Sequence, residues 1–198
     1  MKILSLCLLM FLSGAILSSP VVETKPNRHV VFLQPFGNIA AADVHFVKTA
    51  LQKVYPFIET KPALALPPSA FSATRNRYRA DSLINFLRRR TAANSTTIGL
   101  TNHDISSTKG KHNDWGVMGL GFCPGNACVA SSFRVLKHKR KEQLYKVAVH
   151  ELGHTEGLPH CPTQSCFMAD AKGSNPLERE TGFCSKCRPF LLRKHWSL

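Results

Sequence analysis

Three histidines and two glutamates stand close together in the segment AVHELGHTEGLPHC, residues 148–161. The sequence that leads into it, KEQLYKVAVHELGH, has apolar residues three to four positions apart and no proline, which predicts an amphipathic helix. On such a helix His150 and His154 lie one turn apart on one face, so both imidazoles can reach a single ion. The spacing therefore predicts two ligands of a metal site.

The chain is expected to reverse direction directly after this helix. Gly157 can take the positive φ that ends a helix and Pro159 cannot continue one, so we expect His160 to return to the same ion. Three neutral imidazoles leave a tetrahedral zinc with one open position, as in a catalytic site. Glu151 lies about 100° around the helix from His150, where it reaches a water more readily than the ion. The pattern predicts hydrolysis of peptide bonds by a zinc-activated water with Glu151 as general base.

Seven cysteines are present, and the last four form a C-x4-C pair followed by a C-x2-C pair. These four are Cys161, Cys166, Cys184 and Cys187. The spacing favours a closed structural zinc on four thiolates, which would stabilise a C-terminal segment with little core of its own. Two disulfides are the competing interpretation, because exported proteins meet an oxidising space. Cys123 and Cys128 flank the turn CPGNAC and could form a disulfide or remain free thiols.

The run of residues 150–187 resembles the archaemetzincins, zinc metallopeptidases marked by H-E-x-x-H-x-x-G-x-x-H-C-x4-C-x-M followed by C-x-x-C. The resemblance implies a catalytic zinc on His150, His154 and His160, with Glu151 as general base. It also implies a Met-turn at Met168 beneath the metal and a structural zinc on the four cysteines. Two zinc ions per chain and a compact, metzincin-like single domain are therefore expected.

Short apolar segments alternate with helical patterns before the metal-site helix. We expect strands over residues 29–33, 57–60, 96–101, 113–122 and 127–135, and helices over residues 39–54 and 80–90. This order predicts an α/β (α+β) fold in which a mixed sheet packs against helices, the active-site helix among them. Residues 115–122, which are rich in glycine, could bind an extended peptide as an added strand, although an ordinary strand or loop explains them equally well.

The N-terminus has the pattern of a secretory signal peptide over residues 1–18, with cleavage after Ala15 or Ser18. The remaining residues, 19–198, are expected to form one peptidase domain without a further membrane segment. Export to a secreted or periplasmic location follows, and Cys7 would be removed. An uncleaved anchor is the competing interpretation, and the protein would be cytoplasmic if the segment is no signal at all.

A net charge of +14 makes the chain strongly basic, with clusters at residues 75–79, 88–90, 137–141 and 188–196. This charge raises a second function, a basic zinc-stapled binding module for nucleic acid or other polyanions. Aromatic residues do not interleave with the charges as base stacking requires, so we expect these basic clusters to be solvated surfaces that bind no specific nucleic acid. The peptidase is expected to be a monomer that acts on peptides or proteins. The remaining histidines are expected to lie at the surface or in satisfied polar contacts: His29, His45, His103, His112, His138 and His195.

Overall fold

The computed structural model describes residues 28–194 and 196–198. The predicted signal peptide at residues 1–18, with Cys7, and also His195 lie outside the described residues.

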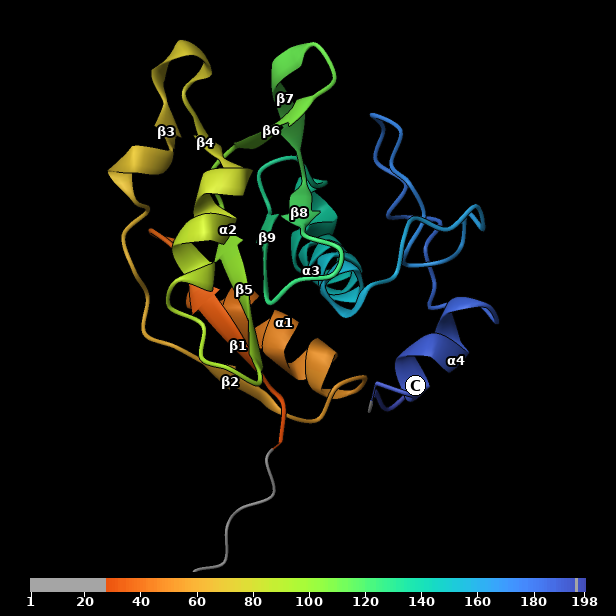
Figure 1. The fold of residues 1–198 in the computed structure, drawn as a ribbon. Coiled ribbons are helices and arrows are strands. Elements are labelled where there is room, and N and C mark those ends of the chain that lie inside the picture. The colour runs from red at the N-terminus through yellow and green to blue at the C-terminus, as the bar shows by residue number, and fades with distance from the viewer. Residues whose placement is uncertain (1–27, 195) are drawn as a thin grey trace, which may run out of the picture.

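A five-stranded mixed sheet forms the centre of the molecule, in the order β2-β1-β5-β9-β8 (Figure 1). Its strands are β1 Val30–Pro35, β2 Ile58–Thr60, β5 Ser95–Thr101, β8 Gly119–Gly121 and β9 Ala127–Ser131. The first four strands in this spatial order run parallel, and β8 pairs antiparallel with β9 at the sheet edge. Every residue of β5 is buried, which fits the β-branched, uncharged sequence that predicts a central strand there.

Helices cover both faces of this sheet, as the predicted alternation of strands and helices requires. α1 Ala41–Gln52 and α3 Arg140–Glu156 pack together on one face, where Val47, Leu144 and Leu152 belong to one buried cluster. α2 Ala80–Arg88 covers the other face and forms a second cluster with Leu83 and Leu87. The mixed α/β fold is confirmed, and α3 is held against the sheet by its apolar side.

A second sheet, which the sequence does not predict, stands above the first in Figure 1. It contains β3 Phe71–Ser72, β4 Arg77–Arg79, β6 Ile105–Lys109 and β7 His112–Val117, in the order β3-β4-β6-β7. The segment expected as one strand over residues 113–122 is divided, because β7 pairs with β6 whereas β8 pairs with β9. Met118 lies at the division, and its carbonyl accepts a hydrogen bond from the Ser131 amide. β7 and β8 are edge strands of their two sheets.

The segment after α3 has little regular structure apart from α4 Cys187–Leu192. It is held to α3 by polar contacts, since the Lys146 ammonium donates to the carbonyls of Leu177 and Glu180 at 2.7 and 2.8 Å. The Trp196 indole also donates to Glu156 at the end of α3. Three short 3-10 helices complete the described elements: Pro68–Ala70, Ala73–Arg75 and Lys137–Lys139. Within residues 28–194 and 196–198, no helix has both the length and the apolar character needed to cross a membrane.

Candidate metal centre

α3 and the turn that follows it bring the three predicted histidines together. α3 ends at Gly157, which has φ of 106° in the left-handed region, as the sequence predicts. The ring centroids of His150 and His154 are 4.7 Å apart, and the His160 ring lies 5.4 and 4.8 Å from them. One nitrogen from each ring lies within 4.8 Å of the others, so the cluster has the size of a metal site.

Backbone carbonyls fix the orientation of the two helical histidines. Nδ1 of His150 lies 2.6 Å from the Phe167 carbonyl oxygen, and Nδ1 of His154 lies 2.7 Å from that of Leu158. Because a carbonyl only accepts, each Nδ1 must carry the proton and donate it. In the neutral rings Nε2 then has a free lone pair, which is the protonation state that a metal ligand needs.

The two Nε2 atoms face each other at 3.1 Å. With both protons on Nδ1, this pair is no hydrogen bond, because two acceptors lie opposite one another. Two nitrogens bound to one tetrahedral zinc are about 3.3 Å apart, from a bond length of about 2.0–2.1 Å. The donor set and its spacing therefore fit a zinc ion held between the rings, with the exposed His160 closing the third side.

Burial keeps the helical imidazoles neutral. It lowers the pKa of His150 to about 3, with the neighbouring His154 contributing in the same direction. Burial likewise lowers the pKa of His154. Both rings are consequently neutral at neutral pH, with the proton on Nδ1 and Nε2 available as a ligand.

Glu151 lies on the same turn of α3 and is buried against the edge strand β8. A side chain at Gly119 would meet its Cγ at 2.7 Å, and one at Gly121 would meet its backbone oxygen at 2.7 Å. The glycines of β8 thus make room for the carboxyl group. Burial raises the pKa of Glu151 to about 8, which suits a group that both accepts and releases a proton near neutral pH.

Met168 lies beneath α3 and is fully buried. A Cβ at Gly153, between the two helical histidines, would lie 2.5 Å from the Met168 sulfur. The Met168 carbonyl accepts a hydrogen bond of 2.7 Å from the Cys161 amide. This residue therefore connects the floor of the histidine cluster with the cysteine segment.

The four spaced cysteines also converge. Their sulfur atoms all lie within 4.8 Å of one another, and the Sγ atoms of Cys161 and Cys184 are 3.6 Å apart. Two sulfurs on a tetrahedral zinc are about 3.8 Å apart, from a bond length of about 2.3 Å. The set fits a closed four-thiolate site, and all four residues are free thiols in the structure.

The remaining described cysteines and histidines, which were not predicted as ligands, stay apart from these clusters. Cys123 and Cys128 are free thiols as well, and Cys128 is buried in β9. The remaining described histidines join neither metal-binding group. Among them, His29 contacts the Thr96 hydroxyl at 3.0 Å.

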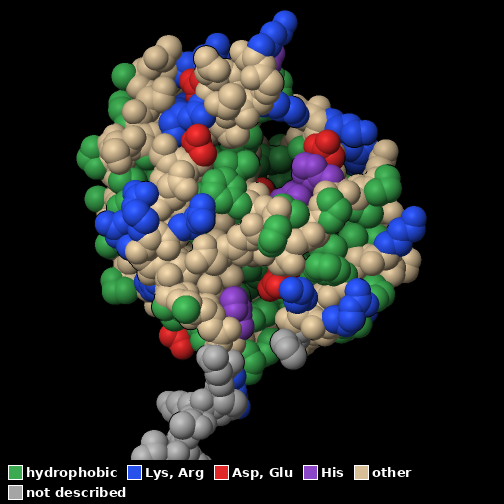
Figure 2. Space-filling model, in the orientation of Figure 1, with side chains coloured by type: hydrophobic (Ala, Val, Ile, Leu, Met, Phe, Trp, Pro, Cys, Tyr) green, Lys and Arg blue, Asp and Glu red, His purple; other side chains and the backbone are tan. Residues whose placement is uncertain are grey.

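A cleft of about 870 Å³ leads away from the histidines along β7 and β8. Figure 2 shows histidine side chains at the border of a hollow on this face of the molecule. The cleft continues to Arg77 and Arg134, which Asp104 joins by ion pairs. Sequence reasoning missed this group because its members are far apart in the chain; only the charge of the RNRYR segment pointed to it.

Fold, histidine cluster and cleft together define a metallopeptidase-type hydrolase. Comparison with known proteins identifies the family within this class of hydrolases. The model of peptidase family M54 matches residues 41–193. The archaemetzincin of Methanopyrus kandleri is 33% identical over 137 residues, which cover 67% of this chain and 76% of the relative. That of Haloquadratum walsbyi is 28% identical over 176 residues, 82% of this chain and 99% of the relative.

Solved structures agree with the sequence comparison. The crystal structure of the Methanopyrus kandleri archaemetzincin superposes with a TM-score of 0.75 at 28% identity, covering 88% of this chain and 99% of that one. The Archaeoglobus fulgidus archaemetzincin, in complex with malonate, gives 0.70 at 26% identity, covering 81% and 98%. The chain belongs to peptidase family M54, the family of the archaemetzincins. It is a zinc metallopeptidase, so of the two functions expected from the sequence the comparisons support the enzyme.

Proposed function

We propose that His150, His154 and His160 hold one catalytic zinc and that Glu151 is the general base of peptide hydrolysis. The observation that supports this most strongly is the pair of facing Nε2 lone pairs at 3.1 Å, fixed by carbonyls on Nδ1. Two acceptors this close repel each other unless a cation lies between them. Glu151 is the buried carboxyl group on the same helical turn.

The residues divide the reaction between them. Zinc, when bound, supplies a Lewis acid that polarises the peptide carbonyl and lowers the pKa of a water molecule. The Glu151 carboxylate accepts a proton from this water as the water oxygen attacks the carbonyl carbon. The carbon–nitrogen bond then breaks, and Glu151 returns the proton to the leaving nitrogen. A pKa near neutrality allows one carboxyl group to serve in both steps.

A second zinc on Cys161, Cys166, Cys184 and Cys187 completes the proposed set of two ions. The sulfur spacing of the four free thiols supports this assignment. Such a site would fix the segment between α3 and α4, which contains no helix or strand, and would contribute folding free energy outright. Met168 would then transmit that rigidity to α3 through its contact with Gly153.

The substrate is proposed to be an extended peptide lying along β8. This strand pairs only with β9 among the described strands, so its outer edge can accept another strand. Gly119 and Gly121 have no side chains to hold such a peptide away from Glu151. The same arrangement places the peptide beside the cleft that the histidines border.

The location and organisation of the protein are proposed from the sequence. A signal peptide at residues 1–18 would direct export, and residues 19–198 would be one peptidase domain acting as a monomer. Strong positive charge is compatible with a secreted protein that keeps solvated faces.

Replacement of the general base tests the proposal. Glu151→Gln should retain zinc and thermal stability but lose about 10²–10⁴-fold in hydrolysis of a mixed peptide library read by mass spectrometry. Glu142→Gln is the matched control, since Glu142 lies on the same helix, is more than half exposed and, among the described residues, forms an ion pair with Lys146 alone. Wild-type turnover by zinc-loaded Glu151→Gln would refute the assignment.

A further inference from the structure

Guanidinium groups line the cleft together with the histidines. The cleft's basic residues are Arg75, Arg77, Lys109, Arg134 and Lys172. The peptide-hydrolysis mechanism uses none of these residues. Carboxyl groups line the same cleft, so the fixed geometry of the arginines, and not the net charge, is what indicates a role in substrate binding.

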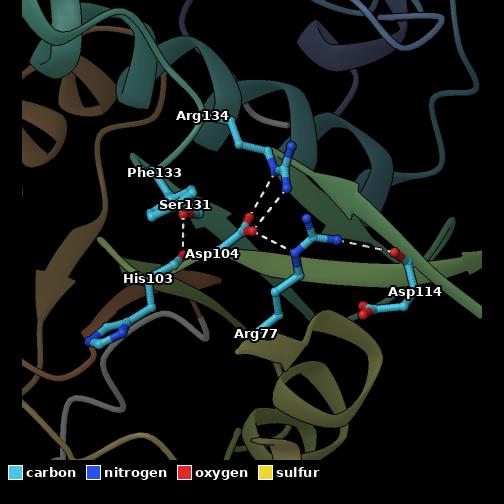
Figure 3. Close-up of polar contacts among 7 residues, drawn as sticks. All are labelled: Arg77, His103, Asp104, Asp114, Ser131, Phe133 and Arg134. Atoms are coloured by element: carbon cyan, nitrogen blue, oxygen red, sulfur yellow. Dashed lines mark hydrogen bonds and ion pairs between the residues drawn. The ribbon is translucent and has the colours of Figure 1, made fainter. Parts of the chain in front are cut away.

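Two of the arginines are held in place by a single carboxylate (Figure 3). Asp104 is only 9% exposed. Its Oδ1 and Oδ2 accept from Nε and Nη2 of Arg134 at 2.8 and 2.9 Å, and Oδ2 also accepts from Nε of Arg77 at 2.6 Å. Asp114 adds its backbone carbonyl, which accepts from Nη1 of Arg77 at 3.2 Å. The three charged side chains come from separate parts of the chain, so the fold builds the group.

This arrangement leaves N–H donors of both arginines without an acceptor among the bonds described. The bonds above occupy Nε and Nη2 of Arg134 and Nε and Nη1 of Arg77, and leave Nη1 of Arg134 and Nη2 of Arg77 for a further acceptor. Among the described residues Asp104 is the one carboxylate that pairs with these two guanidinium groups, and the Asp114 carboxylate lines the same cleft without a hydrogen-bond partner. A pair of oriented guanidinium groups with spare N–H donors is well suited to a carboxylate, which Arg binds in two-pronged geometry.

The position of the pair relative to the scissile bond follows from the edge strands. The Arg134 guanidinium packs on the backbone of Gly116 so closely that no Cβ would fit there, and Glu151 packs on Gly119 in the same way. Val117 and Met118 stand between the two glycines, and the chain bends at Met118 where it leaves β7 for β8. A peptide that runs antiparallel to β8 would bring its carboxyl-terminal side toward Gly116.

We propose that Arg134, supported by Arg77 and Arg75, binds a substrate carboxylate on the carboxyl side of the cleaved bond. The substrate path is taken from the proposed function, on which this inference rests. Either the C-terminal carboxylate of a short peptide or the side chain of an acidic residue would supply the chemistry. The protein would accordingly favour peptides that end, or carry an acidic residue, on this side of the cleavage point.

Peptide binding to a variant that does not hydrolyse its ligand tests the site apart from catalysis. The probes are acetyl-hexaalanine as the free acid, the same peptide as its C-terminal amide, and amides with one glutamate at successive positions. Dissociation constants are measured by NMR titration of zinc-loaded Glu151→Gln, alone and combined with Arg134→Gln, Arg75→Gln or Arg89→Gln. Arg89 is the matched control, because it is an exposed arginine at the end of α2, outside the cleft.

We expect the free acid, or one of the glutamate peptides, to bind about tenfold more tightly than the plain amide. Arg134→Gln should remove this preference and Arg89→Gln should keep it. Arg75→Gln should reduce this preference about threefold. Arg75 makes no ion pair with the described residues, so its replacement should leave the fold intact and still test the site if Arg134→Gln fails to fold.

Equal binding of acid, glutamate and plain amide peptides would overturn the inference, as would a preference that survives both cleft substitutions. A lack of binding by every carboxylate peptide would overturn it as well. Hydrolysis by zinc-loaded wild type is scored separately. If hydrolysis is absent while carboxylate-dependent binding holds, the proposed reaction is wrong and the carboxylate site stands.

Discussion

Gly119→Ala should impair catalysis without removing zinc, because the new methyl group would point at Glu151. A Cβ at this position would lie 2.7 Å from Cγ and 2.8 Å from Cδ of Glu151, whereas an ordinary contact begins at 3.4 Å. The carboxyl group must therefore move by about 0.7 Å. Misplacement of a reacting group by 1 Å can cost about 100-fold, so we expect kcat/KM to fall about 10- to 100-fold. This loss corresponds to about 1.4–2.7 kcal/mol of transition-state stabilisation.

The assay compares zinc-loaded wild type, Gly119→Ala and Gly182→Ala on one peptide library, with zinc content and thermal unfolding measured on the same samples. Gly182→Ala is the matched control, since a Cβ there would meet no heavy atom within 4 Å. It should retain wild-type kcat/KM. Wild-type hydrolysis by zinc-loaded Gly119→Ala would refute the reasoning, because Glu151 could not then be the base in its observed position.

Two further predictions concern stability and metal content. Burial raises the pKa of Glu180 to about 7 from 4.5, so between these values the folded protein keeps a proton that the unfolded chain has released, and stability falls as pH rises. The free energy of unfolding of Glu180→Gln, measured by chemical denaturation, should therefore rise relative to that of wild type by about 2 kcal/mol between pH 4 and pH 8. Parallel pH profiles of the two proteins would contradict this. Cys166→Ser should bind one zinc fewer per chain and unfold at a lower temperature than wild type. Cys123→Ser, outside the cluster, should match wild type in zinc content and unfolding temperature. Unchanged zinc content in Cys166→Ser would exclude the four-thiolate site.

The metal-site helix was predictable because its evidence is local. Apolar spacing, the His150 and His154 pair and the helix-ending Gly157 all lie within about five turns of one helix. The central strand β5 was predictable for a similar reason, since its β-branched sequence matches complete burial. The cysteine spacing likewise predicted the cluster of four thiols that the fold brings together.

The second sheet and the arginine group were not predictable in this way. β3 and β4 have only two and three residues, too short for any alternation to stand out, and β4 is the basic sequence RYR. Asp104 meets Arg77 across 27 residues and Arg134 across 30. No local pattern encodes contacts at that separation, because tertiary pairing alone creates them. The glycines of β7 and β8 stand out in the sequence, but only the structure shows why they are there, since Arg134 and Glu151 pack on them.

Anomalous X-ray diffraction at the zinc edge, on crystals of the purified protein, tests the central claim most directly. The account predicts one peak about 2.0–2.1 Å from the Nε2 atoms of His150 and His154 and a nitrogen of His160. A second peak is expected about 2.3 Å from the four cysteine sulfurs. A map with no peak among the histidines, or with Glu151 as a direct ligand of the ion, would contradict the proposed catalytic site.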